Sequence, residues 1–517
     1  MAKKQKNLHP DAPLLHDDHP RPVSRRDFLR QGFISGTGMV LGGSVFSLFA
    51  NPRAAQAALS SDIQTLADSS GCPVGTFSGG KIPVICFDLA GGASIAGSNV
   101  LVGGPGGQLD LLSTAGYSKL GLPGDMLPGQ TEAAPSPTSN GDFTDGSFGL
   151  LFHSDSAFLR GMLEKTAPGT RANVDGALIP ARSANDTANN PHNPMYGFAR
   201  AGAGGEVVTL IGSQSSDSGG RSMAPASLID LEIRPTKVDR PSDVTGMVDT
   251  GNLTGILDAN DVVPVMESMA RLADRKVALP SITGDAVIQD LIRCGYIGAA
   301  DIADRFAGVD INPDDRNAAN PVIVSDAGGI FTEAEFDGDR EFRKTASVMK
   351  MVIDGYAGAG TIAMGGYDYH TGDRETGERR DLRAGRCMGA CLEYAARVGV
   401  PLMLYVFSDG SLSSNGTIDN SVDGRGKGVW TGDNSSTAAS MILYYHPVAK
   451  PVPIRRQIGY FSADGSAVTS SSPAANNVNL LVNTVVLNYM SINGDINQFA
   501  TLFPNHGLGN LNNLIAF

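Results

Sequence analysis

An aspartate and a histidine stand two residues apart in the stretch GGYDYH, which runs from Gly365 to His370. The apolar, glycine-rich segment before it predicts a strand, so Asp368 and His370 lie at the expected carboxyl end of that strand. Carboxylate oxygen and imidazole nitrogen are ligands that zinc, manganese and iron accept. The same two residues are also common in polar turns. Three interpretations therefore stay open: a metal site, the remnant of one, or a polar turn.

A further acidic residue, Asp409, ends the apolar segment VPLMLYVFSD, which predicts a buried strand. Strands and helices alternate through this half of the chain, which is typical of an α/β fold with a mainly parallel sheet. In such sheets functional residues gather at the carboxyl ends of the strands. We therefore expect Asp368, His370 and Asp409 to converge from two adjacent strand ends.

Other histidines give weaker indications of a site. His192 lies in the polar, unpatterned loop 181–197, which is a candidate binding element. We expect structural roles for three others, His153, His446 and His506.

The pattern of apolar residues predicts the elements that position these side chains. Residues 200–330 are expected to form a more variable subdomain inserted in, or appended to, the main sheet. The expected strands are 81–92, 206–212, 226–233, 359–370, 400–411 and 437–447, and the expected helices are 153–167, 260–276, 284–306, 339–358, 381–398 and 476–492.

The amino-terminal segment has the order of an export signal. Arg25 and Arg26 precede a glycine-rich apolar run, and small residues follow at Ala55 and Ala57. A paired arginine in this order is typical of the twin-arginine (Tat) route, so we expect the Tat translocase as a partner and a periplasmic or secreted protein. Residues 1–57 are expected to be removed near Ala57, and the alternative is an uncleaved membrane anchor.

The charge balance excludes some functions. Residues 1–57 carry eight basic and four acidic residues, so their removal takes the net charge from −13 to −17. An acidic protein binds polyanions poorly, and no nucleic-acid partner is expected. No later segment offers eighteen uninterrupted apolar residues, so we expect no transmembrane segment in the mature chain.

The five cysteines leave at least one thiol unpaired in an oxidising compartment. Cys387 and Cys391 stand four apart in a predicted helix, where a disulfide is disfavoured. We expect them to be small buried core residues. A zinc site built from cysteines alone lacks the partners it needs.

The order of these motifs resembles a family of Tat-exported bacterial proteins of unknown function, related to the alkaline phosphatase and sulfatase superfamily. The residues that carry the resemblance are SRRDFLR near the amino terminus, DLAGGAS with Gly91, Gly92 and Ser94, GGYDYH, and FSDGSLSSNG with Asp409. The similarity extends in order and spacing across most of residues 81–510.

The resemblance implies an alkaline-phosphatase-like three-layer sandwich over residues 58–517. It makes Asp368 and His370 ligands of one metal and Asp409 a ligand of a neighbouring one. It places the nucleophile just after the first strand, where Ser94 and Ser98 stand. The family's Asp-His pair corresponds to Asp433–Asn434 here, which keeps a carboxylate ligand at Asp433 and replaces the imidazole by an amide.

Two functions follow as hypotheses. The first is an exported hydrolase of a small phosphate or sulfate ester that depends on a divalent metal, zinc or manganese. The alternative is a non-catalytic periplasmic binding protein, or an envelope- or secretion-associated protein, whose phosphatase-like site is degenerate. The metal content of the purified mature chain separates them best.

Overall fold

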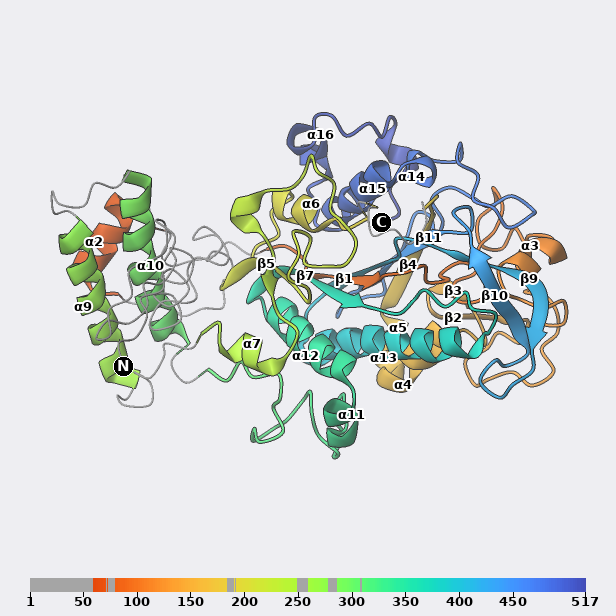
Figure 1. Cartoon of the computed structure of the whole chain (residues 1–517), viewed down its shortest axis with the longest axis horizontal. Helices are drawn as coiled ribbons and strands as arrows, with labels where there is room; N and C mark the ends of the chain where they lie inside the picture. Colours follow the sequence, from red (N-terminus) through yellow and green to blue (C-terminus); the bar gives the residue numbers. More distant parts are fainter. Residues whose placement is uncertain are drawn as a thin grey trace, which may run out of the picture.

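The computed structural model describes residues 59–70, 72, 80–183, 190, 192–248, 259–277, 286–306 and 309–517. The predicted export signal at residues 1–57 and part of the loop 181–197 lie outside the described residues. A seven-stranded sheet forms the centre of the described chain (Figure 1). Its strands are, in spatial order, β4 (Val174–Pro180), β11 (Ala439–Tyr445), β8 (Leu402–Phe407), β1 (Val84–Leu89), β7 (Ala357–Met364), β5 (Val208–Gly212) and β6 (Thr236–Lys237).

The sheet is mainly parallel, which confirms the expected α/β class. Only β11 runs antiparallel to its neighbours, β4 and β8, while the four other pairs are parallel. All residues of β1, β7 and β8 are buried, as expected for strands covered on both faces. The expectation that Asp368 and Asp409 follow adjacent strands is wrong, because β1 lies between β7 and β8.

Helices cover both faces of the sheet, which gives three layers (Figure 1). Along β1, Ile85 and Phe87 join one hydrophobic core, whereas Val84 and Cys86 join the other, because successive side chains of a strand point to opposite faces. The helices of the first core are α4 (Ala157–Lys165), α12 (Arg340–Ile353) and α13 (Glu375–Val398), and those of the second are α6 (Met195–Arg200) and α15 (Val478–Ile492).

Helices α4 and α13 pack closely because glycines line their contact. A Cβ at Gly161 would lie 2.3 Å from the carbonyl oxygen of Leu382, and one at Gly385 would lie 2.3 Å from that of Phe158. On the same helix α13, Cys387 and Cys391 are free thiols buried in the core, as expected.

Two antiparallel pairs of strands stand apart from the central sheet. β9 (Leu412–Asp419) and β10 (Lys427–Asp433) form a ribbon between β8 and β11 in the sequence, and β2 (Thr144–Phe148) pairs with β3 (Leu150–His153). The remaining short elements are α3 (Thr114–Lys119), α5 (Pro168–Ala172), α7 (Pro241–Thr245), α11 (Glu333–Gly338), α14 (Pro473–Asn476), α16 (Phe499–Leu502), η1 (Leu231–Ile233), η2 (Ile496–Gln498) and η3 (Leu511–Asn513).

Residues 200–330 contribute to two parts of the structure. Strands β5 and β6 belong to the central sheet. Helices α9 (Ala259–Val277) and α10 (Ala286–Arg305) instead pack with α2 (Ser61–Ser69) around a small core of their own. A disulfide between Cys72 and Cys294 ties the end of α2 to α10.

The strand expected at 226–233 is wrong. This segment forms a turn and the short 3-10 helix η1, and Leu231 is 72% exposed. The Asp230 side chain accepts a hydrogen bond from the amide of Glu232 at 3.0 Å, which caps the turn. A side chain that bonds its own backbone in this way competes with strand pairing.

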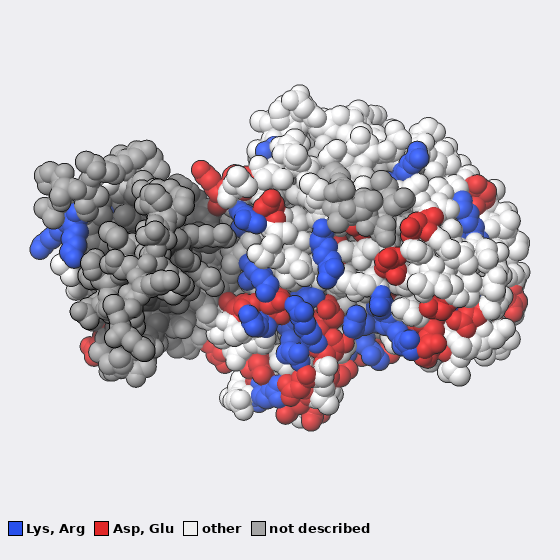
Figure 2. All heavy atoms as spheres, viewed as in Figure 1, with Lys and Arg blue, Asp and Glu red and all other residues white. Residues whose placement is uncertain are grey.

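Lysine and arginine side chains gather over α12 and α13 on the face shown in Figure 2, with acidic side chains between them. Several basic side chains of these two helices are paired: Arg386 forms an ion pair with Glu164, and Arg379 pairs with Glu375. Within the described ranges, no helix combines the length and the apolar character that a membrane crossing needs.

Candidate metal centre

The segment after β7 presents alternate side chains to the core and to the surface. Tyr367 and Tyr369 are buried, whereas the side chains of Asp368 and His370 are 53% and 34% exposed. This is the alternation of extended backbone, so burying the two tyrosines turns Asp368 and His370 outward together.

The two tyrosines are fixed by their hydroxyl groups. Tyr367 donates to the carbonyl oxygen of Arg380 at 3.0 Å. The Tyr369 hydroxyl donates to Oδ1 of Asp381 at 2.9 Å and accepts from the amide of Ser94 at 3.1 Å. The extended segment is therefore anchored to α13 and to the loop after β1, which limits how far Asp368 and His370 can move.

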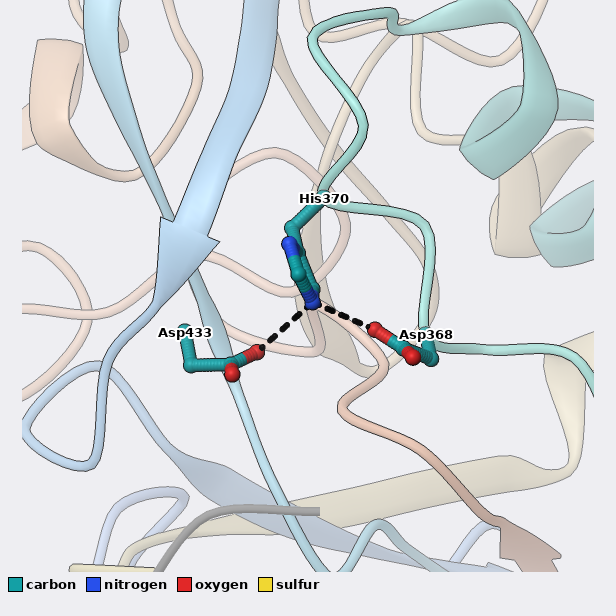
Figure 3. Close-up of side chains that lie close together, drawn as sticks. All are labelled: Asp368, His370 and Asp433. Atoms are coloured by element: carbon teal, nitrogen blue, oxygen red, sulfur yellow. Dashed lines mark ion pairs between the residues drawn. The ribbon is translucent and has the colours of Figure 1, made fainter.

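Asp433, the last residue of β10, completes a cluster with Asp368 and His370 (Figure 3). Nε2 of His370 lies 2.7 Å from Oδ1 of Asp368 and 3.5 Å from Oδ1 of Asp433. One ligand atom of each residue lies within 4.8 Å of the others. Sequence reasoning named all three residues, and the structure brings them together.

This donor set suits a divalent metal. Two ligands of a tetrahedral zinc ion stand about 3.3 Å apart, since the bonds are about 2.0–2.2 Å long. The separations of His370 Nε2 from the two carboxylates lie on either side of that value. The three residues could therefore hold one divalent cation between them.

Asp409 lies outside this cluster. It follows β8 and is buried, and its Oδ1 accepts a hydrogen bond from the amide of Gly91 at 2.8 Å. Its carbonyl oxygen accepts from Ser183 Oγ at 2.5 Å and from Asn190 Nδ2 at 2.7 Å. Asp409 therefore holds the glycine turn after β1 and the polar loop, rather than joining Asp368 and His370.

Asp88, on β1, shapes a second turn near this edge of the sheet. Its Oδ2 accepts from the amides of Arg221 and Ser222 at 2.7 and 2.8 Å, and its Oδ1 accepts from Ser222 Oγ at 2.8 Å. Burial, opposed by these hydrogen bonds and reinforced by the charge of Asp409, raises the pKa of Asp88 to about 6. The Asp88 carboxyl group therefore positions the backbone of residues 221–222.

The two candidate nucleophiles lie in the interior. Ser94 is 3% exposed and Ser98 is fully buried. The Ser94 carbonyl accepts from Asn99 Nδ2 at 2.8 Å. In the part of the chain that the structure describes, the Ser98 hydroxyl has no hydrogen-bond partner. A substrate could not reach the Ser98 hydroxyl without a rearrangement of this loop.

Asn434 has a structural contact. Its Oδ1 accepts from the amide of Ser436 at 2.9 Å and from Ser436 Oγ at 2.7 Å. The side chain thereby closes the turn after β10, while the neighbouring Asp433 faces His370. The period of a strand explains the difference, because successive side chains point to opposite sides.

The other histidines are occupied by structural contacts. Burial lowers the pKa of His192 to about 3 and that of His153 to about 4. His192 stacks on Phe407, and Nε2 of His153 lies 2.9 Å from the carbonyl oxygen of Met126. Nδ1 of His446 accepts from the amide of Val448 at 3.3 Å, as expected for a turn histidine. His370 alone among the described histidines belongs to the acidic cluster.

No protein-family model matches the chain, and no curated protein matches it either. The described chain is thus defined by its fold, an α/β protein with a mainly parallel seven-stranded sheet, and by one candidate metal centre at the edge of that sheet.

Proposed function

We propose that the chain is an exported hydrolase that uses one divalent metal, zinc or manganese, to cleave a small phosphate or sulfate ester. The observation that carries the proposal is the cluster of Asp368, His370 and Asp433. Two of its residues follow the carboxyl end of β7, the edge where α/β sheets hold their ligands. The three layers and this location support an alkaline-phosphatase-like fold.

Three protein ligands are the number that a catalytic zinc uses, with a fourth position left for water or substrate. A metal held there lowers the pKa of its water and polarises a phosphoryl or sulfuryl oxygen. Asp368, His370 and Asp433 are each about one third to one half exposed, so a substrate can approach the open position. The buried Tyr367 and Tyr369 hold the segment that carries Asp368 and His370 in place.

The burial of Ser94 and Ser98 favours water as the nucleophile. Within the described residues the acidic cluster is single, which supports one metal rather than a pair. The proposed reaction is therefore direct attack of a metal-activated water on the ester, with no covalent serine intermediate.

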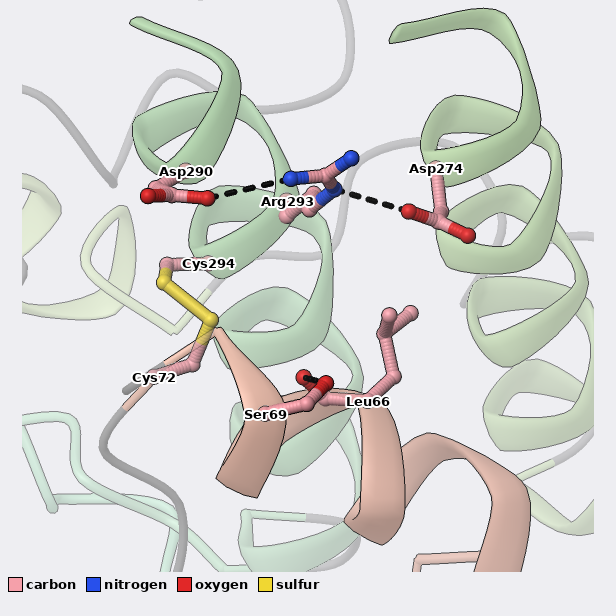
Figure 4. Close-up of a disulfide and its surroundings, with 7 residues drawn as sticks. All are labelled: Leu66, Ser69, Cys72, Asp274, Asp290, Arg293 and Cys294. Atoms are coloured by element: carbon pink, nitrogen blue, oxygen red, sulfur yellow. Dashed lines mark hydrogen bonds and ion pairs between the residues drawn. A yellow bond between two sulfur atoms is a disulfide. The ribbon is translucent and has the colours of Figure 1, made fainter. Parts of the chain in front are cut away.

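The disulfide supports an exported protein (Figure 4). Disulfides persist in oxidising compartments and are rare in reducing ones. Cys72 lies fifteen residues after the expected cleavage position at Ala57. The disulfide joins it to Cys294 on α10. The disulfide supports export in general, and the Tat translocase is proposed as the partner from the Arg25–Arg26 pair.

Metal analysis and an ester assay test the proposal together. The purified mature chain should contain close to one zinc or manganese, measured by elemental analysis, and should hydrolyse p-nitrophenyl phosphate or p-nitrophenyl sulfate. His370→Ala should lose both properties. His446→Ala, which changes a turn histidine away from the cluster, should keep both. A mature chain that binds no divalent metal would exclude this function.

The alternative is a non-catalytic binding protein with a degenerate site. Buried serines and a single cluster are what a phosphatase-like site without turnover would show. Metal binding with no hydrolysis of either ester, at any added zinc or manganese concentration, would favour this alternative.

A further inference from the structure

Two arginines flank the glycine pair that precedes the metal cluster. A Cβ at Gly365 would lie 2.8 Å from the guanidinium carbon of Arg221, and one at Gly366 would lie 2.5 Å from Nη1 of Arg380. Consecutive Cα atoms are about 3.8 Å apart, so the two guanidinium groups lie within roughly 12 Å of each other. Arg380 thus lies against the residue two before Asp368, and Arg221 lies against the residue three before it.

The backbone of Arg221 is held in place. Its amide donates to the buried carboxyl group of Asp88 at 2.7 Å. A Cβ at the preceding Gly220 would lie 2.5 Å from Oδ2 of the same carboxyl group, so the turn fits tightly against it. Asp88 therefore fixes the turn from which the Arg221 side chain reaches Gly365.

Arg380 is placed by α13 and by Tyr367. The Tyr367 hydroxyl donates to the carbonyl oxygen of Arg380, which ties the helix to the segment that carries Asp368. The guanidinium group packs on Gly366, where only a glycine leaves room for it.

Neither guanidinium group has a carboxylate partner among the described residues. Many other described arginines of this acidic chain do pair with a carboxylate. Arg374 lies 2.8 Å from Glu378, and Arg316 lies 2.7 Å from Asp337. Arg221 and Arg380 therefore bring two positive charges without a carboxylate partner to the glycine pair that leads to Asp368.

We infer that Arg221 and Arg380 bind the anionic group of the substrate and select a dianionic phosphate monoester over a monoanionic sulfate ester. This inference rests on the proposed function. Asp368 and Asp433 neutralise a divalent ion, so the metal centre itself carries no net charge. The two guanidinium groups then supply two positive charges, which match a phosphate monoester above its second pKa of about 6. Guanidinium groups also donate paired hydrogen bonds to such oxygens.

Two small anions that are not hydrolysed test this selection: methylphosphonate as a dianion and methanesulfonate as a monoanion of similar shape. Calorimetry at pH 8.5, with and without zinc, should show that the mature chain binds methylphosphonate at least tenfold more tightly. Arg221→Ala and Arg380→Ala should each weaken methylphosphonate binding by about tenfold, since each removes a charged hydrogen bond. Arg221→Lys and Arg380→Lys should keep most of the preference, because they keep the charge.

Arg275→Ala is the matched control, since Arg275 is exposed on α9, which packs with α2 and α10 rather than on the central sheet. It should leave both affinities unchanged. Equal affinity of the wild type for the two anions, or an unchanged preference in the Arg221→Ala/Arg380→Ala double variant, would overturn the inference. The outcome is separable from that of the proposed function. Failure to bind either zinc or manganese would exclude the hydrolase, while a preference that depends on both arginines would still establish the anion site.

Discussion

A Cβ at Gly91 would lie 2.6 Å from the backbone nitrogen of Asp368. Gly91 has φ +117°, a conformation that other residues rarely adopt, and its amide donates to the carboxylate of Asp409. The residue thus touches a candidate ligand on one side and is bound by Asp409 on the other. The position of Asp368 depends on this turn, although Gly91 and Asp409 lie outside the cluster.

Gly91→Ala should therefore weaken zinc binding, by about tenfold or more, because the added methyl group displaces Asp368 from the site. Zinc titration calorimetry measures the loss. Gly141→Ala is the matched control, since Gly141 has φ +84° but no atom within 4 Å of its Cβ position. Both variants should lose stability from backbone strain, and only Gly91→Ala should lose zinc affinity. An equal loss of affinity in both would contradict the role assigned to Gly91.

Asp409→Ala should mainly lower stability, whereas Asp368→Ala should mainly lower zinc affinity. Removing the Asp409 carboxylate leaves the Gly91 amide without its acceptor, so the free energy of unfolding should fall by about 1–3 kcal/mol. Asp368 is 53% exposed, so its removal should cost little stability but should greatly reduce zinc affinity. Urea denaturation and zinc titration of both variants check this. Loss of zinc binding without loss of stability in Asp409→Ala would instead make Asp409 a ligand.

Asn434→His should bind zinc no more tightly than the wild type. The resemblance to the phosphatase-related family implies a gain if this side chain points into the site, because histidine would restore an imidazole ligand. In the structure the Asn434 side chain closes the turn at Ser436, so histidine there should lose this cap and lower stability by about 1 kcal/mol. Calorimetric titration decides between the two, and a marked rise in affinity would support the expectation from the resemblance.

The buried Asp381 should make stability depend on pH. Burial is the main cause that raises its pKa to about 7, against about 3.9 for an unfolded chain. The folded chain then binds the additional proton, so the stability from this group is complete below about pH 4 and is lost as the pH rises through 7. Asp381→Asn should reduce the difference in unfolding free energy between pH 5 and pH 8. The exposed Asp125→Asn serves as control, and an undiminished difference in Asp381→Asn would contradict the assignment.

Local patterns predicted the elements well because their signals are short in range. The strands β1, β7, β8 and β11 lie within apolar segments bounded by glycine or proline, and α4 begins where the Ser156 side chain caps it. The alternation of Tyr367 and Tyr369 with Asp368 and His370 also lies in the sequence. Together these give the fold class and two of the cluster residues, Asp368 and His370, whereas Asp433 was expected only from the family resemblance.

Such local patterns do not predict how distant elements of the chain are arranged in space. Nothing near Asp409 indicates that β1 separates its strand from β7, because strand order is set by packing across the whole sheet. The burial of Ser98 depends on the loop folding back after β1, and a hydroxyl residue gives no sign of this in the sequence. Arg221 and Gly365 are likewise distant in sequence and meet only through the turn that Asp88 holds.

Trp430, the one tryptophan of the chain, lies on β10 three residues before Asp433. Its indole is buried and packs with the guanidinium of Arg374 at 4.5 Å, and its backbone bonds to Gly372 and Asp373, just after His370. The tryptophan fluorescence of the protein therefore originates from a single position, on the strand that ends at Asp433. Excitation at the red edge of the indole band selects the emission of Trp430. A change in that emission on addition of zinc would report cation binding without any added label.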